Sequence, residues 1–486
     1  MEDTNELLAV RRAKLDKLRA LGVNPFGQAF PGAESSGAIL AAFAEGKPAR
    51  LAGRVVAHRD MGKSHFLHLQ DGDGRLQIYV QTKTLPEREQ EIFKLVDLGD
   101  FIGVDGTLFV TKTGEKTVKV SGLTFLSKAL RPLPGKYHGL QDVEQRHRQR
   151  YLDLLSNPAT RRTLTLRSAI VSETRRFLQD KNFLEVETPM MQAVPGGAAA
   201  QPFVTRHHAL GLELFLRIAP ELYLKRLLVG GYDKVFELNR NFRNEGIDRK
   251  HNPEFTMLEA YWAYADYEQM ALLVEELITR LAEKFCGGAV LRHPQYNADG
   301  EVIGEKVIDL TRPWPRKKYR DCVTEAAGAD WFTISAAERR ERARQLGVEI
   351  IPALEDFEVT NQVYEKLVEA KTLNPLFVTH LPKELVPLAK LNADDDRVVD
   401  VYELVINGQE ISPGYSELND PVTQRERLEH QAGGETQKLD EDFLAALEHG
   451  MPPAGGLGLG IDRLVMLLTG AESIRDVILF PLLRPR

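Results

Sequence analysis

The chain has 486 residues, of which 43% are hydrophobic and 27% charged, and it carries a formal net charge of −7. This length is too great for one compact core and predicts two or three domains, and the composition is that of an ordinary globular protein. The net negative charge excludes indiscriminate electrostatic attraction to nucleic acid but allows a nucleic-acid partner met through a local basic patch.

The sequence does not predict a membrane or secreted protein. No apolar run approaches the length of a membrane span, and the charged N-terminal segment has no apolar signal-peptide core. The two cysteines, Cys286 and Cys322, stand far apart and have no Cys or His spaced to form a metal site with them. We therefore expect a cytoplasmic protein with no disulfide and no membrane partner.

Residues 1–49 predict an N-terminal helix and a connection. Leucines recur at helical spacing among basic residues, and Gly22 with Pro25 marks the end of the helix. Two interpretations stay open, a helix docked on the next domain, which we favour, and an RNA-binding arm. Residues 26–48 are rich in Gly, Ala and Pro, which is typical of a connecting segment.

Residues 50–130 predict a small β-barrel. Five short β-rich runs are separated by Gly, Asp and Lys turn residues, and five strands in about eighty residues are typical of an OB-fold. The run that begins at Arg131 contains Pro and Gly and predicts a linker over residues 131–150.

Residues 151–486 predict a larger domain of mixed helices and strands. Helical patterns such as TLRSAIVSETRRFLQDKN occur beside strand patterns such as KVFELNRNFRN and DVYELVINGQEI. Strands mostly follow strands instead of alternating with helices, which favours an antiparallel sheet flanked by helices. The predicted fold class is therefore α+β, with a five-stranded barrel followed by this domain.

Three ordered segments of the larger domain carry the functional signal. KNFLEVETP lies within about residues 175–191, FRNE and HNPEFTMLE lie within about 235–261, and GLGLGIDRL lies within about 455–482. Together they resemble motifs 1, 2 and 3 of the class II aminoacyl-tRNA synthetases, and in detail the lysine-specific members of that family. The resemblance extends from about Arg50 to Pro481, although Asn182 stands where motif 1 usually has glycine.

The resemblance implies that ATP activates L-lysine as lysyl-adenylate and that the lysyl group then passes to the 3′-terminal adenosine of tRNA(Lys). A carboxylate must attack the α-phosphorus of ATP, and because these two anions repel each other, catalysis should depend on charge neutralisation and alignment. Arg243 and Arg463 match the catalytic arginines of motifs 2 and 3. The residues that match the ATP site are Arg243, Glu245, His251, Asn252, Phe255 and Arg463.

The resemblance also implies an acidic pocket for lysine. Glu221, Glu417 and Tyr261 match residues that hold the ε-ammonium, whereas Glu259 and the Gly197 backbone match groups that hold the α-amino group. Two unit charges about 4 Å apart attract by on the order of 4 kcal/mol in a protein cleft, so neutral amino acids should be rejected. The full set implied for lysine is Gly197, Glu221, Arg243, Glu259, Tyr261, Tyr415 and Glu417.

Two acids match the Mg²⁺ ligands of the family. Glu403 and Glu410 lie on what we predict to be one strand, where their odd spacing would point them to opposite faces. A bulge at Asn407-Gly408 would bring them together. Hard oxygen ligands shared with ATP phosphates suit magnesium, whereas either acid alone is also explained as a solvated edge carboxylate.

By the same resemblance the barrel binds the anticodon of the tRNA. Phe66 would stack on the central uridine, Gln77 would read its hydrogen-bonding edge, and Arg59 would hold backbone or base nearby. The alternative places Phe66 in the barrel core and Gln77 on an exposed strand. The catalytic motifs downstream favour the anticodon interpretation.

Three other functions stay open. A lysine ligase acting on a protein substrate would be expected to lack the anticodon barrel, and a catalytically silent tRNA-binding protein would be expected to lack the motif arginines. An aspartate- or asparagine-specific synthetase is the remaining competitor, although an aspartate pocket needs the opposite polarity. The family resemblance further implies a homodimer formed through motif 1.

Overall fold

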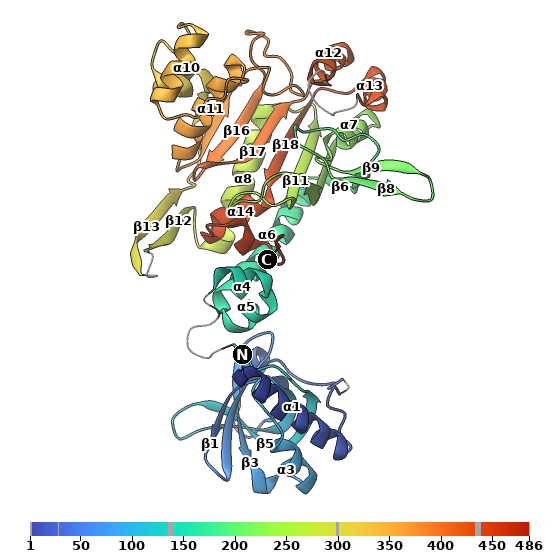
Figure 1. The fold of residues 1–486 in the computed structure, drawn as a ribbon, viewed down its shortest axis with the longest axis vertical. Helices are drawn as coiled ribbons and strands as arrows, with labels where there is room; N and C mark the ends of the chain where they lie inside the picture. The colour runs from blue at the N-terminus through green and yellow to red at the C-terminus, as the bar shows by residue number, and fades with distance from the viewer. Residues whose placement is uncertain are drawn as a thin grey trace. The chain divides into compact units, whose positions relative to one another are not determined.

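The computed structural model describes residues 2–27, 29–134, 140, 142–297, 301–432 and 439–485. The chain divides into two compact units, Met1–Gln141 and Asp142–Arg486 (Figure 1). Gly135, which belongs to the predicted linker, lies outside the described residues. Within the described ranges, no helix has the length and apolar character needed to cross a bilayer.

The first unit is a closed five-stranded barrel, as the sequence predicts. Neighbouring strands pair in the order β1-β2-β3-β5-β4, and pairing of β4 with β1 closes the barrel. Alternate residues such as Leu67 and Leu69 are buried in its interior. The elements of this unit are α1 (Glu2–Ala20), α2 (Ser36–Ala41), β1 (Pro48–Asp60), β2 (Ser64–Gln70), β3 (Arg75–Gln81), η1 (Thr82–Thr84), α3 (Glu87–Phe93), β4 (Phe101–Val110) and β5 (Lys116–Ser127).

The N-terminal helix α1 docks on the barrel. Leu18 is fully buried among the core residues of the barrel. The guanidinium of Arg11 donates to the backbone carbonyls of Leu98 and Ala129 at 2.9 Å and of Arg131 at 3.1 Å. Because Arg11 is held by three carbonyl groups, the helix is docked on the barrel, as the favoured interpretation predicts.

The second half of the predicted linker is helical and belongs to the second unit. Asp142 caps helix α4 (Val143–Arg148) by accepting two hydrogen bonds from backbone N–H groups of its first turn. Arg150 begins helix α5 (Arg150–Ser156), is fully buried, and pairs with Asp153 at 2.7 Å. Residues 143–150 of the predicted linker are therefore helical instead of an extended connection, and a buried ion pair holds Arg150 in place.

An eight-stranded sheet lies at the centre of the second unit, in the order β14-β15-β16-β17-β18-β11-β10-β6. Neighbouring strands are antiparallel except in the two outer pairs, β14–β15 and β10–β6, which are parallel. The predicted antiparallel sheet flanked by helices is confirmed. The strands are β6 (Leu184–Glu185), β10 (Lys234–Phe242), β11 (Glu254–Ala263), β14 (Arg316–Lys318), β15 (Leu376–Thr379), β16 (Val401–Ile406), β17 (Gln409–Ser416) and β18 (Ala454–Gly460).

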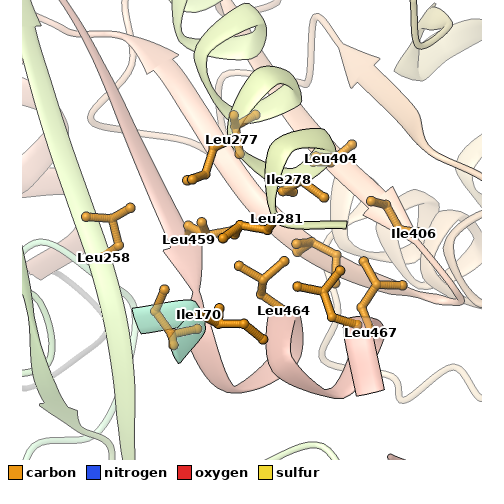
Figure 2. Close-up of a cluster of buried hydrophobic side chains, with 14 of the residues drawn as sticks. Ile170, Leu258, Leu277, Ile278, Leu281, Leu404, Ile406, Leu459, Leu464 and Leu467 are labelled. Carbon is orange, nitrogen blue, oxygen red and sulfur yellow. The ribbon is translucent and has the colours of Figure 1, made fainter. Parts of the chain in front are cut away.

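Helices α6, α8 and α14 form the main core with this sheet (Figure 2). Leu281 of α8 and Leu464 of α14 meet strand residues such as Leu459. A capping box at Asp266 begins α8, and Gly287, with φ 81°, ends it. The helices are α6 (Pro158–Asp180), α7 (Glu221–Val229), α8 (Tyr267–Cys286), α9 (Tyr319–Ala327), α10 (Ala336–Gln345), α11 (Asp356–Leu367), η2 (Glu369–Lys371), α12 (Pro421–Ala432), α13 (Glu441–Glu448), α14 (Ile461–Thr469) and α15 (Ile474–Val477).

Two smaller sheets complete the described part of the second unit. One is three-stranded, in the order β7-β9-β8, and the other is the antiparallel pair β12–β13. Their strands are β7 (Met191–Gln192), β8 (Val204–His207), β9 (Leu212–Leu216), β12 (Val290–Tyr296) and β13 (Val302–Asp309).

Candidate active site

A cavity of about 350 Å³ lies over the central strands of the large sheet. On β11, Leu258 and Ala260 belong to the core, so alternation turns Glu259 and Tyr261 to the opposite face, where they line the cavity. Of the residues predicted for ATP, lysine and metal, all but Glu403 and Glu417 line it. They are Gly197, Glu221, Arg243, Glu245, His251, Asn252, Phe255, Glu259, Tyr261, Glu410, Tyr415 and Arg463.

Arg243 marks the cationic end of the cavity. It follows β10, and its backbone N–H donates to the carbonyl oxygen of Pro253 at 2.9 Å. Its guanidinium carbon lies 5.2 Å from the centre of the Phe255 ring. Its Nε atom is buried and has no hydrogen-bond partner within the described residues. A buried, unsatisfied donor of this kind is suited to an anionic ligand.

Arg463 reaches the same cavity from the first turn of α14. Its Nη1 donates to the carbonyl oxygen of Glu410 at 2.7 Å, and its Nη2 lies 3.3 Å from Nε2 of His251. Nδ1 of His251 lies 2.8 Å from a carboxylate oxygen of Asp248. A proton on Nδ1 would bond to that carboxylate and leave Nε2 to accept from Arg463. The motif 3 arginine is therefore fixed beside the motif 2 loop.

The opposite end of the cavity is acidic, and its side chains are buried. Tyr261 donates to Oε2 of Glu259 at 3.2 Å, and both side chains are buried. Burial and the charge of Glu221 raise the pKa of Glu259 to about 8. Burial likewise raises the pKa of Glu417 to about 8, against the opposing charge of Lys225. These carboxyl groups gain most from a ligand that brings positive charge.

Glu417 has a carboxylate oxygen that is available to such a ligand. The side chain is 1% exposed, and within the described ranges its Oε1 has no hydrogen-bond partner. A Cβ atom on Gly456 would lie 2.0 Å from Oε1 and 2.6 Å from a ring carbon of Tyr261. The free oxygen and the tyrosine ring therefore border the same space, above a strand position that only glycine fits.

Gly197 allows the chain to pass close to the acidic end. Its φ is 88°, and a Cβ atom there would lie 3.0 Å from Cβ of Glu221 and 3.1 Å from Cβ of Ala219. Both the left-handed backbone and the close approach favour glycine. The structure thus places the Gly197 backbone at the edge of the cavity, where the sequence predicts it.

Sequence analysis missed Lys225, a buried cation beside the cavity. Its Nζ lies 2.7 Å from Oε1 of Glu221 and 2.5 Å from Oε2 of Glu417. Burial alone would lower the pKa of Lys225, but the charges of the two glutamates outweigh it and raise the pKa above its ordinary value. The available signal was the spacing of Glu221 and Lys225, which places them one turn apart on the same helix face.

A second missed residue, Asp462, positions Arg463. One carboxylate oxygen of Asp462 accepts from the backbone N–H of Thr256 at 2.7 Å, and the other pairs with Arg167 at 2.5 Å. Asp462 thereby ties the start of α14 to β11 and to α6. Its place next to the motif arginine was visible in the sequence, but the pairing with Arg167 is a long-range contact that no local pattern reveals.

Glu403 and Glu410 lie on two strands, so the prediction of a single strand is wrong. Asn407 and Gly408, with φ 56° and 73°, form the turn between β16 and β17. The bulge lies elsewhere, between Leu404 and Val405 in the pairing with β17. The hairpin brings the two acids together because Asn407-Gly408 folds the chain back on itself.

These acids form an acidic cluster with Glu369. Burial first, and then the charges of Glu410 and Glu369, raise the pKa of Glu403 well above its ordinary value. The Tyr364 hydroxyl donates to Glu403 at 3.1 Å. No group of three or more His, Cys, Asp or Glu in the described part of the chain is arranged to hold a metal by itself. Two carboxylates that share Mg²⁺ with nucleotide phosphates fit this arrangement.

Three predicted anticodon residues lie on one outer face of the barrel. Arg59 pairs in register with Phe66, Phe66 pairs with Tyr79, and Gln77 is two residues from Tyr79 on the same strand face. Phe66 is half-buried, outside the barrel core, and its ring centre lies 5.0 Å from that of Tyr79. Gln77 is buried and donates to Oγ1 of Thr117 at 2.8 Å. The alternative of a core Phe66 and an exposed Gln77 is therefore wrong.

The family of the chain follows from comparison with known proteins. Residues 142–484 match the family model described as tRNA synthetases class II (D, K and N), and residues 49–126 match the model of an OB-fold nucleic acid binding domain. The chain belongs to this family of class II tRNA synthetases.

Three relatives resemble the chain over nearly its whole length. The lysine–tRNA ligases of Pelotomaculum thermopropionicum, Carboxydothermus hydrogenoformans and Bacillus cereus are 50%, 49% and 46% identical to it. The matches cover 100%, 100% and 99% of this chain, and 96%, 99% and 98% of the respective relatives.

Proposed function

We propose that the chain is a lysine–tRNA ligase, which activates L-lysine with ATP and transfers it to the 3′-terminal adenosine of tRNA(Lys). The observation that carries the proposal is the polarity of the cavity. Its acidic end is lined by Glu221 and Glu259, with the unpartnered Oε1 of Glu417 beside the ring of Tyr261, and its other end presents Arg243 and Arg463. The family membership and the names of the relatives support the same activity.

In the first step, the lysine carboxylate attacks the α-phosphorus of ATP and displaces pyrophosphate. Arg243 supports this step because its planar guanidinium can bind a phosphate and a carboxylate together and reduce their repulsion. Phe255 and Arg463 would hold the adenine between them, and His251, Asn252 and Glu245 would contact the nucleotide. In the second step, a terminal ribose hydroxyl of the tRNA attacks the carbonyl carbon of lysyl-adenylate and displaces AMP.

Lysine fits the acidic end better than the other amino acids of the family. Its two ammonium groups can meet Glu417 at one place and Glu259 at another, since both carboxyl groups are buried and Oε1 of Glu417 has no hydrogen-bond partner within the described residues. Aspartate would bring a second carboxylate to this negative environment and would be repelled. Asparagine would leave a buried carboxylate without its cation.

Magnesium is proposed as the cofactor. Glu403 and Glu410 would hold it, and when bound it would supply positive charge to the phosphates of ATP. The raised pKa of Glu403, which follows from burial and the neighbouring charges of Glu410 and Glu369, supports this assignment because a cation would relieve that repulsion.

A homodimer and a cytoplasmic location complete the proposal. In the first motif, Leu184 and Met191 expose large apolar side chains at 47% and 57%, as expected of a segment that packs against a partner. Both Cys286 and Cys322 are free, which suits a reducing compartment.

ATP–pyrophosphate exchange with each amino acid in turn tests the proposed activity. We expect exchange with lysine and none above background with aspartate or asparagine. Aminoacylation of tRNA(Lys), compared with lysylation of a protein fraction, separates a tRNA ligase from a protein ligase. Exchange that depends on aspartate or asparagine, or no exchange with any amino acid, would contradict the proposal.

Lysine should bind more tightly as the pH rises from 6 to 8. In the free protein the pKa values of Glu259 and Glu417 are about 8, so both are largely protonated at pH 6. The ammonium groups of lysine favour the ionised carboxylates, so binding releases protons and the affinity rises by up to about tenfold per pH unit for each proton released. Calorimetric titration in buffers of different ionisation enthalpy measures this release. An affinity that is constant between pH 6 and 8 would refute the assignment.

Replacing Phe66 by alanine should weaken tRNA binding. Loss of one base-stacking ring costs about 1–3 kcal/mol, so we expect the KM for tRNA in aminoacylation to rise by about 5- to 150-fold. Lysine-dependent exchange needs no tRNA and supplies the reference rate for each preparation. Phe26→Ala, which removes a 49% exposed ring from the same unit, is the matched control. An unchanged KM for tRNA would remove Phe66 from the anticodon site.

A further inference from the structure

Lys225 occupies the junction between two carboxylates of the acidic pocket. It belongs to α7 and is 0% exposed. Its Nζ meets Oε1 of Glu221 from its own helix and Oε2 of Glu417, which follows β17. The only other contact described for this ammonium group is the carbonyl oxygen of Leu388 at 3.4 Å. One ammonium therefore bridges two acids that come from different parts of the fold.

This bridge fixes which oxygen of Glu417 is available. Oε2 faces Lys225, whereas Oε1 lies over Gly456 and beside the ring of Tyr261. Without a cation, Glu221 and Glu417 would be two like charges in a buried space and would repel each other or share a proton. With Lys225 in place, the pKa of Glu417 is lower than burial alone would make it, and its carboxyl group is held in one orientation.

The bridge also sets the charge of the pocket. Glu221, Glu259 and Glu417 provide three acidic groups, and Lys225 offsets one of them. The remaining two match the two ammonium groups of lysine, while Arg243 is left for its carboxylate. A pocket without Lys225 would have one acidic group more than its ligand can neutralise.

We propose that Lys225 is a specificity-determining residue that positions Glu417, because its ammonium ties Glu221 to Glu417 and presents the free Oε1 to the side-chain ammonium of the substrate. The inference rests on the proposed lysine specificity. Lys225 is a positioning residue, since it acts on the substrate through Glu417 and is itself excluded from the cavity surface.

The first test replaces Lys225 by methionine, which keeps the length of the chain and removes the charge. In lysine-dependent pyrophosphate exchange, we expect the KM for lysine to rise by at least about tenfold and the KM for ATP to stay within about twofold. Lys234→Met is the matched control, because Lys234 packs over Trp262 at 4.1 Å and lies outside the cavity. A KM for lysine that is unchanged or lower in K225M would overturn the proposal, as would equal losses for lysine and ATP.

The second test uses charge compensation. The double variant E221Q/K225M removes one negative and one positive charge, so the buried charges again balance. We expect it to have a lower KM for lysine than K225M alone, because Glu417 no longer faces a second buried charge. Thermal unfolding shows whether K225M folds. If it does not, the double variant is assayed in its place. If the increase in the KM for lysine in the double variant equals the product of the increases in E221Q and K225M, the proposal is overturned.

The third test is the pH dependence of the KM for lysine in K225M. Removing the ammonium removes the charge that favours ionised Glu417, so the pH at which lysine binding falls on the acid side should move upward by about one unit or more. An unchanged pH profile would overturn the proposal. The charged and titratable groups that face Glu417 are Glu221, Lys225, Tyr261 and Tyr415.

Failure of this inference is distinguishable from failure of the proposed function. If the protein does not use lysine, the unaltered enzyme shows no lysine-dependent exchange. If only the role of Lys225 is wrong, the unaltered enzyme exchanges with lysine and K225M retains the same KM and pH profile.

Discussion

Replacing Arg243 by alanine is expected to lower lysine-dependent pyrophosphate exchange by about 10²- to 10³-fold while the protein stays folded. The attacking carboxylate and the α-phosphate are both anions, and Arg243 lines the cavity with a buried Nε that lacks a hydrogen-bond partner within the described residues. Because the interaction strengthens as the two anions meet, the loss should fall on kcat more than on the KM for either substrate.

Arg240→Ala is the control for this substitution. Arg240 lies on the same strand, β10, and pairs with Glu254 at 3.6 Å in a half-exposed position. Its loss should leave exchange within about twofold, because a surface ion pair contributes little. Near-normal exchange in the Arg243 variant, with an unchanged melting temperature, would show that charge neutralisation at the α-phosphate depends on other groups.

The motif residues could be predicted from the sequence because each has a fixed chemical task. Arg243 and Arg463 occur at fixed places next to recognisable strand and helix signals, and the structure places both at one cavity. Asn182 departs from the motif, because it stands in place of the usual motif 1 glycine. It nevertheless adopts the left-handed φ of 63°. Asparagine tolerates the left-handed region better than most residues, so the turn survives the substitution.

The parts that could not be predicted depend on long-range pairing. Lys225 meets Glu417 across almost two hundred positions of the chain, and the sequence alone gives no sign that the two are close. The hairpin that joins Glu403 to Glu410 could not be predicted for a different reason. VYELVINGQEI has continuous strand character, which favours one strand with a bulge at Asn-Gly, although this dipeptide is also a strong signal for a two-residue turn.

On the outer face of the barrel, too, contacts between strands could not be predicted from the sequence. Alternation along the strands is enough to predict which residues face outward, and it places Arg59 and Phe66 on one face. It cannot predict that Gln77, on that same face, is buried and donates a hydrogen bond to Thr117. Burial of an outward residue depends on the neighbouring strand, which in this barrel is the parallel partner β5.

Replacing Gly456 by alanine should strongly weaken lysine binding while leaving the nucleotide site intact. The added Cβ would lie 2.0 Å from Oε1 of Glu417 and 2.6 Å from a ring carbon of Tyr261. Neither neighbour can move freely, because Lys225 holds the Glu417 carboxylate and Tyr261 lies on the central strand β11. A displacement of about 1 Å at such a site can cost about 10²-fold, so we expect at least this increase in the KM for lysine.

Gly304→Ala separates this effect from a general loss of glycine flexibility. Gly304 lies on β13 of the same unit, and its added Cβ would lie 3.5 Å from the side chain of Gln295, which is an ordinary contact. Calorimetric titration of both variants with ATP and with lysine distinguishes the two ligands. We expect Gly456→Ala to bind ATP normally and lysine at least 10²-fold more weakly, whereas Gly304→Ala binds both normally. Normal lysine affinity in Gly456→Ala would mean that the side-chain ammonium does not bind between Glu417 and Tyr261.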